Sequence, residues 1–434
     1  MERVIEVRAG WLQGAPRIGN LYIDQTKGTE VQSFSFDADW LTGHHQLSLS
    51  PDLAMSRGRQ YPAGARNTFC FLSDAAPDRW GRKLIELEQI SLAKEQGRAP
   101  RRLSESDYLL GIADEGRSGG LRFMENGRYL STHGAPIPPI TQIRELEASV
   151  KEYEKTRSVS ALRRLLQPGS SLGGARPKAN VVDQYDHMWI AKFPSRNDEF
   201  SVGKWESLLH QLAGKCGLNT PSTQMMECGE SGGIFLSKRF DRYFKDGENH
   251  RLHFASAMTM LNTTDGAHDK NSYLYIADAI ESLCADPANY LKELWKRMVF
   301  NICVSNTDDH LRNHGFLLKA DDAWALSPVY DLNPNPDGVT MALNITTDDP
   351  TKDVRLALSV ADFFRIGEQE AKEICGEMQK TIRDNWALLA KQNRIPQEEI
   401  KVMGEAFREA EREVAPGRTG EKETPERKPE GKEH

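Results

Sequence analysis

The C-terminal half of the chain has a helix pattern that ends at a polar loop. Apolar residues recur there at the i, i+3, i+4 and i+7 spacing of a buried helix face. These residues are Leu291, Leu294, Trp295, Met298, Val299 and Ile302. A polar stretch, 306–314, follows directly, and after it come two short apolar runs, 315–318 and 323–326, with a polar turn between them. The pattern predicts a helix, a polar loop and a β-hairpin in that order.

The first 60 residues have a different pattern, with short runs rich in β-branched and aromatic residues. The runs 4–7, 21–24 and 31–36 are separated by Gly, Asn, Asp and Pro. We therefore expect a β-rich N-terminal part.

Three segments further along the chain also have regular patterns. A helix capped by Ser73 or Asp74 is expected to continue past Leu87. A strand over 188–194 carries Lys192 among apolar residues, and we expect a helix after it. The apolar face of that second helix comprises Trp205, Leu208, Leu209 and Leu212.

Composition and charge narrow the class of protein. The chain has 434 residues, of which 38% are hydrophobic and 27% charged, as in a soluble globular protein of two or three domains. The net charge of −7 argues against the whole chain being a nucleic-acid binder. No apolar run approaches membrane-spanning length and the N-terminus lacks an apolar signal core, so we expect no membrane contact. The six cysteines are scattered, which favours reduced thiols in the cytoplasm.

The polar loop holds the first candidate for chemistry. Asp308 and Asn313 are 313 − 308 = 5 positions apart, and Asp331 follows beyond the predicted hairpin. Protein kinases use this arrangement: the first Asp accepts the hydroxyl proton, while the Asn and the later Asp bind Mg²⁺.

Two other interpretations of this loop stay open. Asn, Thr and Asp after a helix are also ordinary turn and capping residues. Alternatively, Asp308, Asp309, His310 and His314 could be ligands of a metal hydrolase. The second alternative ranks lower because the chain has no His-Glu-x-x-His motif to complete such a site.

Two lysines are candidates for contacts with phosphate. Lys178 ends a loop of small residues that starts at Ser170, where glycines would let backbone N–H groups approach phosphate oxygens. A simple hairpin turn is an equally good interpretation of that loop. Lys192 lies where a kinase has its phosphate-binding lysine, or it is a lysine that extends from an edge strand into solvent. Glu206 could pair with Lys192 or be exposed. A second Gly-rich turn, 116–120, is expected to be a surface turn.

Taken together, the motifs resemble the HipA family. They are Ser-Ser-Leu-Gly-Gly-Ala-Arg-Pro-Lys-Ala (170–179), Ile-Ala-Lys-Phe (190–193), Lys-Arg-Phe-Asp-Arg (238–242), Asn-Thr-Asp-Asp-His-x-x-Asn (306–313), Pro-Val-Tyr-Asp (328–331) and Asp-Ala-Ala-Pro-Asp-Arg-Trp-Gly-Arg (74–82). The resemblance covers nearly the whole chain apart from the C-terminal tail.

The resemblance implies an α+β, two-lobed protein-kinase-like fold with a β-rich N-terminal subdomain. The expected divisions are an N-terminal HipA-type subdomain (1–130), a small lobe (141–245), a helical large lobe (246–410) and a disordered charged tail (411–434). The implied activity is that of a serine/threonine kinase using ATP and Mg²⁺. Such proteins are toxins of bacterial toxin–antitoxin pairs.

The resemblance also assigns roles to individual residues. It implies that Asp308 is the catalytic proton acceptor and that Asn313 and Asp331 are the magnesium ligands. Ser171, or the adjacent Ser170, is the implied autophosphorylation site, where added negative charge would inactivate the kinase. The implied ATP-binding residues are Gly173, Gly174, Ala175, Arg176, Pro177, Lys178, Lys192, Lys238, Arg239, Phe240, His310 and Tyr330.

The implied partners are a helix-turn-helix antitoxin similar to HipB, operator DNA bound through the antitoxin complex, and a protein substrate such as an aminoacyl-tRNA synthetase. Two other functions remain open at this stage. One is a non-catalytic co-repressor subunit that binds the antitoxin on DNA, and the other is a small-molecule kinase.

Overall fold

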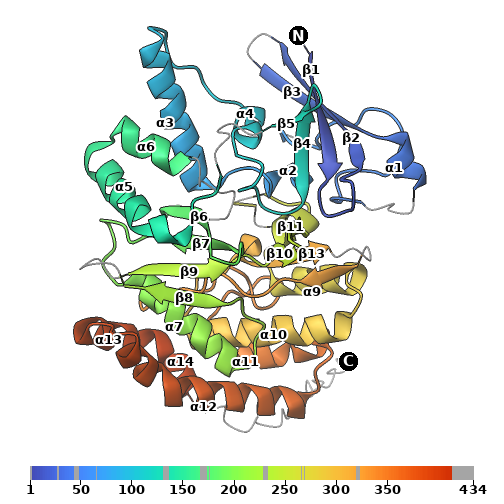
Figure 1. Cartoon of the computed structure of the whole chain (residues 1–434). Coiled ribbons are helices and arrows are strands. Elements are labelled where there is room, and N and C mark those ends of the chain that lie inside the picture. The colour runs from blue at the N-terminus through green and yellow to red at the C-terminus, as the bar shows by residue number, and fades with distance from the viewer. Residues whose placement is uncertain are drawn as a thin grey trace, which may run out of the picture.

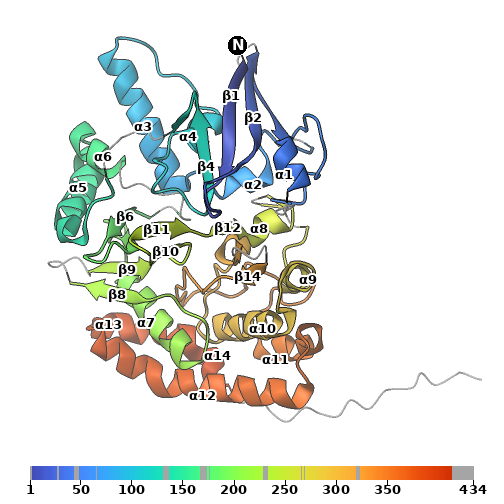
Figure 2. The same cartoon turned by 45° about the vertical axis from the view of Figure 1, so that its right-hand side comes forward.

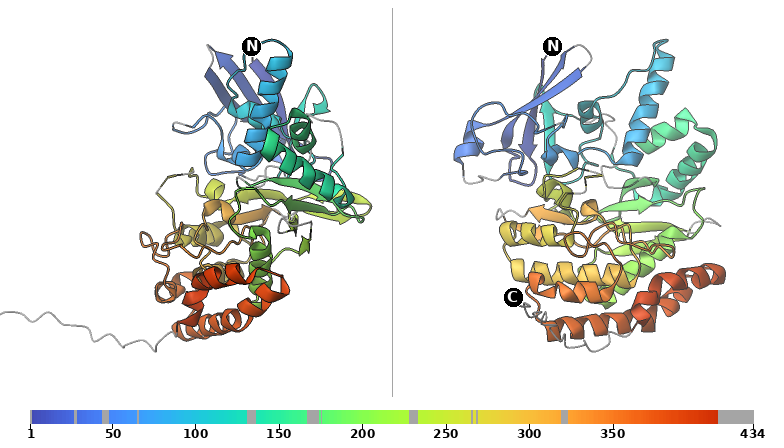
Figure 3. Two further views of the ribbon diagram at one scale, coloured as in Figure 1. Left: turned by 90° about the vertical axis from the view of Figure 1, so that its left-hand side faces the viewer. Right: turned by 180° about the vertical axis from the view of Figure 1, so that it is seen from behind.

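The computed structural model describes residues 2–26, 29–43, 48–64, 66–130, 136–166, 174, 176–227, 233–264, 266–267, 269–318 and 323–412. Three parts are stacked in Figure 1: an N-terminal sheet with its helices at the top, a small sheet in the middle and a mostly helical part below. Views from the side and from behind show the same three layers (Figures 2 and 3).

The N-terminal part is built around a five-stranded antiparallel sheet of order β3-β2-β1-β4-β5. Its strands are β1 (Glu2–Ala9), β2 (Arg17–Thr26), β3 (Thr29–Phe36), β4 (Leu121–Glu125) and β5 (Arg128–Tyr129). In β1, Ile5, Val7 and Ala9 are fully buried, because alternate side chains of a strand point to the same face. The three strands predicted from the first 60 residues are confirmed. The helices of this part are α1 (Ala38–Thr42), α2 (Cys70–Ser73), α3 (Arg79–Glu95) and α4 (Glu105–Leu110).

The middle part is a four-stranded antiparallel sheet of order β6-β7-β9-β8, which separates two hydrophobic cores. Its strands are β6 (Lys178–Val182), β7 (Met188–Lys192), β8 (Thr223–Met226) and β9 (Ile234–Lys238). On one face lie α5 (Ile143–Thr156), α6 (Val159–Leu166) and the 3-10 turn η1 (Ile140–Gln142), and on the other lies α7 (Val202–Lys215) (Figures 1 and 3). The predicted apolar face of α7 is buried in the core of the lower part.

The lower part is organised around α10, whose predicted apolar face is fully buried. The strands of this part are β10 (Arg242–Lys245), β11 (Glu248–Arg251), β12 (His253–Ser256), β13 (Gly315–Leu318) and β14 (Trp324–Leu326). Its helices are α8 (Ala257–Met260), α9 (Tyr273–Leu283), α10 (Pro287–Cys303), α11 (Val354–Ser359), α12 (Glu368–Gln392), α13 (Gln397–Met403) and α14 (Arg408–Glu411). Three 3-10 turns are η2 (Leu311–Asn313), η3 (Ala361–Phe364) and η4 (Gly404–Phe407). The predicted hairpin after the polar loop is confirmed as β13 and β14.

The helix predicted to be capped by Ser73 or Asp74 begins later than expected. Its N-cap is Asp78, whose side chain accepts a hydrogen bond from the backbone N–H of Gly81. Asp74 instead accepts hydrogen bonds from the backbone N–H of Ser256 at 2.7 Å and from its hydroxyl at 3.1 Å. The Asp74 carboxylate thus joins the N-terminal part to the start of α8, a long-range contact that local spacing does not reveal.

The Gly-rich turn 116–120 is buried, so the expectation of a surface turn is wrong. The backbone N–H of Gly119 donates to Asp241 at 2.7 Å, and Arg239 donates to the carbonyl of Gly116 at 2.9 Å. Gly119 has φ +70°, and a Cβ added there would lie 2.9 Å from the backbone nitrogen of Phe254. The turn is buried because the side chains of Asp241 and Arg239 pair with its backbone, and only glycine fits so close to β12.

Most of the predicted tail, from residue 413, lies outside the described residues. Among the residues that are described, no helix has both the length and the apolar character needed to cross a membrane.

Candidate active site

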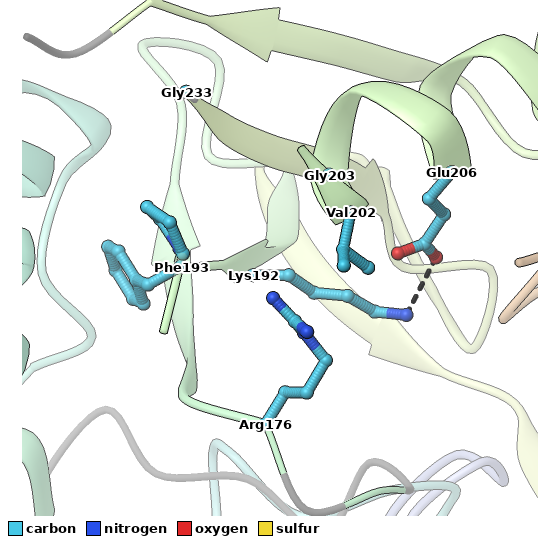
Figure 4. Close-up of a pocket in the computed structure, with 8 residues that line it drawn as sticks. Arg176, Lys192, Phe193, Val202, Gly203, Glu206 and Gly233 are labelled. Atoms are coloured by element: carbon cyan, nitrogen blue, oxygen red, sulfur yellow. Dashed lines mark hydrogen bonds and ion pairs between the residues drawn. The ribbon is translucent and has the colours of Figure 1, made fainter. Parts of the chain in front are cut away.

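Lys192 is the centre of the candidate site and pairs with two carboxylates. It ends β7, and its Nζ lies 2.7 Å from Oε1 of Glu206 on α7 and 2.7 Å from Oδ1 of Asp331. Figure 4 shows the Lys192 side chain extending toward Glu206. The pairing of Lys192 with Glu206, left open by the sequence, is confirmed. A lysine on a strand paired with a glutamate on the following helix is the ion pair that an active kinase requires.

The charge of Lys192 stabilises both carboxylates, of which Glu206 is buried and Asp331 is partly exposed. Burial raises the pKa of Glu206, and Lys192 opposes that shift. Burial also opposes the charged form of Asp331, but the nearby Lys192 outweighs it and lowers the pKa of Asp331 to about 2. For Lys192, the two carboxylates outweigh burial and raise its pKa above the ordinary value. Lys192 and Asp331 are therefore both charged at neutral pH.

A small cavity lies beside Lys192, between β7 and the start of α7 (Figure 4). Its volume is about 10 Å³, roughly the space of one water molecule. Nucleotide-sized ligands need pockets of about 300 Å³ or more, so this cavity is not itself a nucleotide site.

Asp308 and Asn313 lie on the loop that follows α10. Asp308 is exposed, while Asn313 is 8% exposed and donates from Nδ2 to the backbone carbonyl of Asp308 at 3.3 Å. An exposed carboxylate can accept a proton from a substrate hydroxyl that approaches from solvent. Asp331 has φ +59°, a left-handed conformation that non-glycine residues seldom adopt outside constrained positions.

Hydrogen bonds hold this loop against the segment that carries Asp331. Asn333 donates its backbone N–H to the side chain of Asn306 at 3.1 Å, and Asn335 donates from Nδ2 to Thr307 at 3.0 Å. Tyr330 donates its hydroxyl to the carbonyl of Arg312 at 2.5 Å. Hydrogen bonds therefore join the loop that carries Asp308 and Asn313 to the segment that carries Asp331.

Asp309 and His314 are internal to the fold, so the metal-hydrolase interpretation is wrong for them. Asp309 accepts hydrogen bonds from Nε2 of His314 at 2.8 Å, from Asn301 at 2.9 Å and from the hydroxyl of Tyr273. Burial would raise the pKa of Asp309, but the nearby His314 and the hydrogen bond from Tyr273 lower it. In the part of the chain that the structure describes, no group of three His, Cys, Asp or Glu side chains is arranged to hold a metal ion.

The predicted phosphate loop is described in part. Gly173, Ala175, Ser170 and Ser171 lie outside the described residues, whereas Gly174, Arg176, Pro177 and Lys178 lie within them. Arg176 forms a two-pronged ion pair with Asp198, with distances of 2.6 and 2.5 Å.

Lys178 is almost fully buried and lies at the start of β6, directly opposite Lys192. Its Nζ is 2.8 Å from Oδ2 of Asp78. In the sequence, Asp78 is recognisable only as part of a family motif, and nothing there predicts its contact with Lys178. The separation of 178 − 78 = 100 positions gives no local signal for the pair.

The predicted hinge begins at Lys238, the last residue of β9. The backbone N–H groups of Lys238 and Arg239 donate to the carbonyls of Ser222 and Met188, at 2.8 and 2.9 Å. The Arg239 side chain points into the buried turn rather than toward Lys192, since it pairs with Asp241 and the carbonyl of Gly116.

Aromatic side chains connect the hinge to the segment that carries Asp331. The ring of Phe240 lies 5.5 Å from that of Tyr330. His310 is partly buried on the loop of Asp308. Phe240 therefore contacts Tyr330, which precedes Asp331 and is hydrogen-bonded to the loop of Asn313. The Arg239 side chain instead contacts the buried turn at Gly116.

Asn313 and Asp331 are suited to hold magnesium. Mg²⁺ prefers oxygen ligands and usually takes one or two carboxylates together with phosphate oxygens and water. Lys192 donates to Oδ1 of Asp331 at 2.7 Å, and the second carboxylate oxygen, Oδ2, would be the metal ligand.

Comparison with known proteins identifies the family. The model of the HipA-like C-terminal domain matches residues 170–386, which are 217 of the 434 residues. This chain belongs to the HipA family.

The matched segment holds all the residues that the sequence assigned to the site. A protein named putative kinase Y4dM from Sinorhizobium fredii is 31% identical over 157 residues, which are 33% of this chain and 36% of that protein. A putative kinase from Haemophilus influenzae is 24% identical over 191 residues, which are 39% of this chain and 55% of that protein. The alignments thus span between about a third and just over half of these relatives.

A solved structure is similar over almost the whole length. It is HipA of the Shewanella oneidensis MR-1 toxin–antitoxin system, in a complex with HipB and its operator DNA. The TM-score is 0.67 at 16% identity, and the match covers 94% of this chain and 96% of that one. The fold is therefore the predicted α+β, two-lobed kinase-like fold.

Proposed function

We propose that this protein is an ATP- and Mg²⁺-dependent serine/threonine protein kinase that acts as the toxin of a type II toxin–antitoxin system. The observation that carries the proposal is the ion pair of Lys192 with Glu206 and its second contact with Asp331. In kinases this lysine binds the α- and β-phosphates, and the later Asp holds magnesium against them.

Each proposed step uses a group of this chain. Lys192 and the loop from Gly173 to Lys178 bind the phosphates, and Lys238 to Phe240 supply backbone contacts to adenine. Asn313 and Asp331 hold Mg²⁺, which neutralises charge on the phosphates. Asp308 accepts the proton of the attacking hydroxyl. Transfer to Ser171, or to Ser170, inactivates the kinase by adding about two negative charges to a phosphate-binding turn.

The proposed partners rest on the family. A helix-turn-helix antitoxin similar to HipB would bind the chain, and operator DNA would join through that complex, as in the assembly of the Shewanella relative. The proposed substrate is a protein such as an aminoacyl-tRNA synthetase, and the proposed location is the cytoplasm. We also propose the division into 1–130, 141–245, 246–410 and a tail from 411.

The test is transfer of labelled γ-phosphate from Mg-ATP in a bacterial extract. We expect the wild type to label protein, including an aminoacyl-tRNA synthetase, and Asp308→Asn to label none. Asp337→Asn, which changes an exposed aspartate on the segment after Asp331, is the matched control and should behave as the wild type does. Label found only in small molecules would support a small-molecule kinase. No ATP turnover at all would support a non-catalytic co-repressor subunit.

A further inference from the structure

Two lysines stand directly opposite each other on neighbouring strands. Lys178 of β6 and Lys192 of β7 are register partners in the antiparallel ladder, so their side chains project from the same face of the sheet. Like charges in such a pair repel, and the repulsion is only weakly screened because Lys178 is buried and Lys192 is partly buried. Each lysine therefore needs a carboxylate of its own.

Lys192 pairs with carboxylates of the kinase-like part, which comprises the middle sheet and the lower helical part. Lys178 pairs with a carboxylate of the N-terminal part. The Nζ of Lys178 lies 2.8 Å from Oδ2 of Asp78, and both side chains are 2% exposed. Asp78, Lys178, Asp331, Lys192 and Glu206 thus form a group of alternating charge that extends from the N-terminal part to α7.

Each carboxylate oxygen of Asp78 accepts a hydrogen bond. Oδ1 accepts the backbone N–H of Gly81 at 2.7 Å and caps α3, which fixes the carboxylate while Oδ2 faces Lys178. The backbone N–H of Trp80 also donates to the carbonyl of Gly174, at 3.3 Å. The first turn of α3 therefore contacts the phosphate loop at two points, the loop backbone and the lysine that ends it.

We propose that Asp78 is a positioning residue of the nucleotide site, which holds Lys178 toward the phosphates as Glu206 holds Lys192. The assignment rests on the proposed function, because it needs a nucleotide in the site. If Asp78 has this role, the N-terminal part contributes to phosphate binding, although that part lies outside the segment matched by the family model.

Asp78→Asn separates the two roles of this side chain. Asn is as good an N-cap as Asp, so α3 keeps its start, but the charge that holds Lys178 is lost. We expect the dissociation constant of Mg-ATP, measured by calorimetry, to rise about tenfold or more, as for loss of a hydrogen bond to a charged group. The affinity for adenosine should be unchanged, because adenosine has no phosphate to meet Lys178.

The matched control is Asp37→Asn. Asp37 also caps a helix, α1, and also pairs with a cation, Arg17 at 2.5 Å. Helices α1 and α3 lie at opposite ends of the N-terminal part (Figure 1). Asp37→Asn should leave both affinities unchanged. If Asp78→Asn does not fold, Asp78→Ser, which retains an N-cap oxygen, takes its place.

A double-mutant cycle with Lys178→Met decides whether Asp78 acts through Lys178. We expect Asp78→Asn to cause no further loss of Mg-ATP affinity when Lys178 is already Met. Three outcomes would each overturn the role of Asp78: losses in the two variants that multiply, an equal loss of adenosine affinity in Asp78→Asn, or an unchanged Mg-ATP affinity in Asp78→Asn. None of them would contradict the proposed function as long as the wild type binds Mg-ATP. Failure of the wild type to bind Mg-ATP would overturn both.

Discussion

At the scale of single residues, the candidate site depends on the ion pair between Lys192 and Glu206. Lys192, Asp308, Asn313 and Asp331 could be named because kinase chemistry fixes their types and order. The pairing of Lys192 with Glu206 stayed open, since a helical glutamate can equally face solvent. The burial of Glu206 explains why it pairs with Lys192: the residue is only 3% exposed, and a buried carboxylate requires a partner.

Glu206→Gln tests that pairing. Gln has nearly the same shape, so the fold should persist, but Lys192 would then pair with Asp331 alone. Loss of a hydrogen bond between charged groups costs about 1.5–3 kcal/mol, so phosphotransfer measured with Mg-ATP should fall about 10- to 100-fold. Glu248→Gln, an exposed change on β11, is the control. Wild-type rates in Glu206→Gln would show that the pair does not position Lys192.

At the scale of elements, hydrophobic periodicity predicted individual helices and strands but not the features that depend on contacts between distant parts of the chain. The strand that carries Lys192, the helix after it, α10 and the hairpin beyond the loop were all predicted from apolar spacing. The true start of α3 and the burial of the turn 116–120 were not. Both depend on contacts with residues more than 90 positions away, such as Lys178 and Asp241.

Gly119→Ala tests the buried turn. A Cβ there meets the backbone of Phe254 in addition to the left-handed strain of φ +70°. Gly127→Ala is a matched control, because Gly127 has φ +76° with nothing within 4 Å of an added Cβ. The control should lose about 1–2 kcal/mol of unfolding free energy, and Gly119→Ala clearly more, measured by urea denaturation. Equal losses would mean that the turn tolerates a side chain.

At the scale of the whole molecule, buried ion pairs connect the N-terminal part to the kinase-like part. Asp114, between α4 and β4, is 2.7 Å from Arg122 and 2.8 Å from Arg251 on β11. Burial would raise the pKa of Asp114, but Arg251 and Arg122 lower it by more. No motif or local spacing in the sequence predicts this connection, because it depends on how the two parts pack against each other.

Asp114→Asn should destabilise the protein by leaving two arginines near each other without their carboxylate. We expect a loss of about 3 kcal/mol at pH 7, as when one partner of a buried pair is removed. Because the folded-state pKa of Asp114 is lowered, its contribution is complete above pH ~4, the ordinary Asp value, and is lost as the pH falls further. The difference in unfolding free energy between wild type and variant should therefore narrow below pH ~4. A difference that is constant with pH would contradict the ion-pair assignment.

The most direct test of the kinase assignment is intact mass spectrometry of the purified protein before and after incubation with Mg-ATP, with Asp308→Asn alongside. We expect the added mass of a phosphate on Ser171 or Ser170 in the wild type and none in Asp308→Asn. Equal phosphate incorporation in the two proteins would contradict the role of Asp308 in the proposed kinase site.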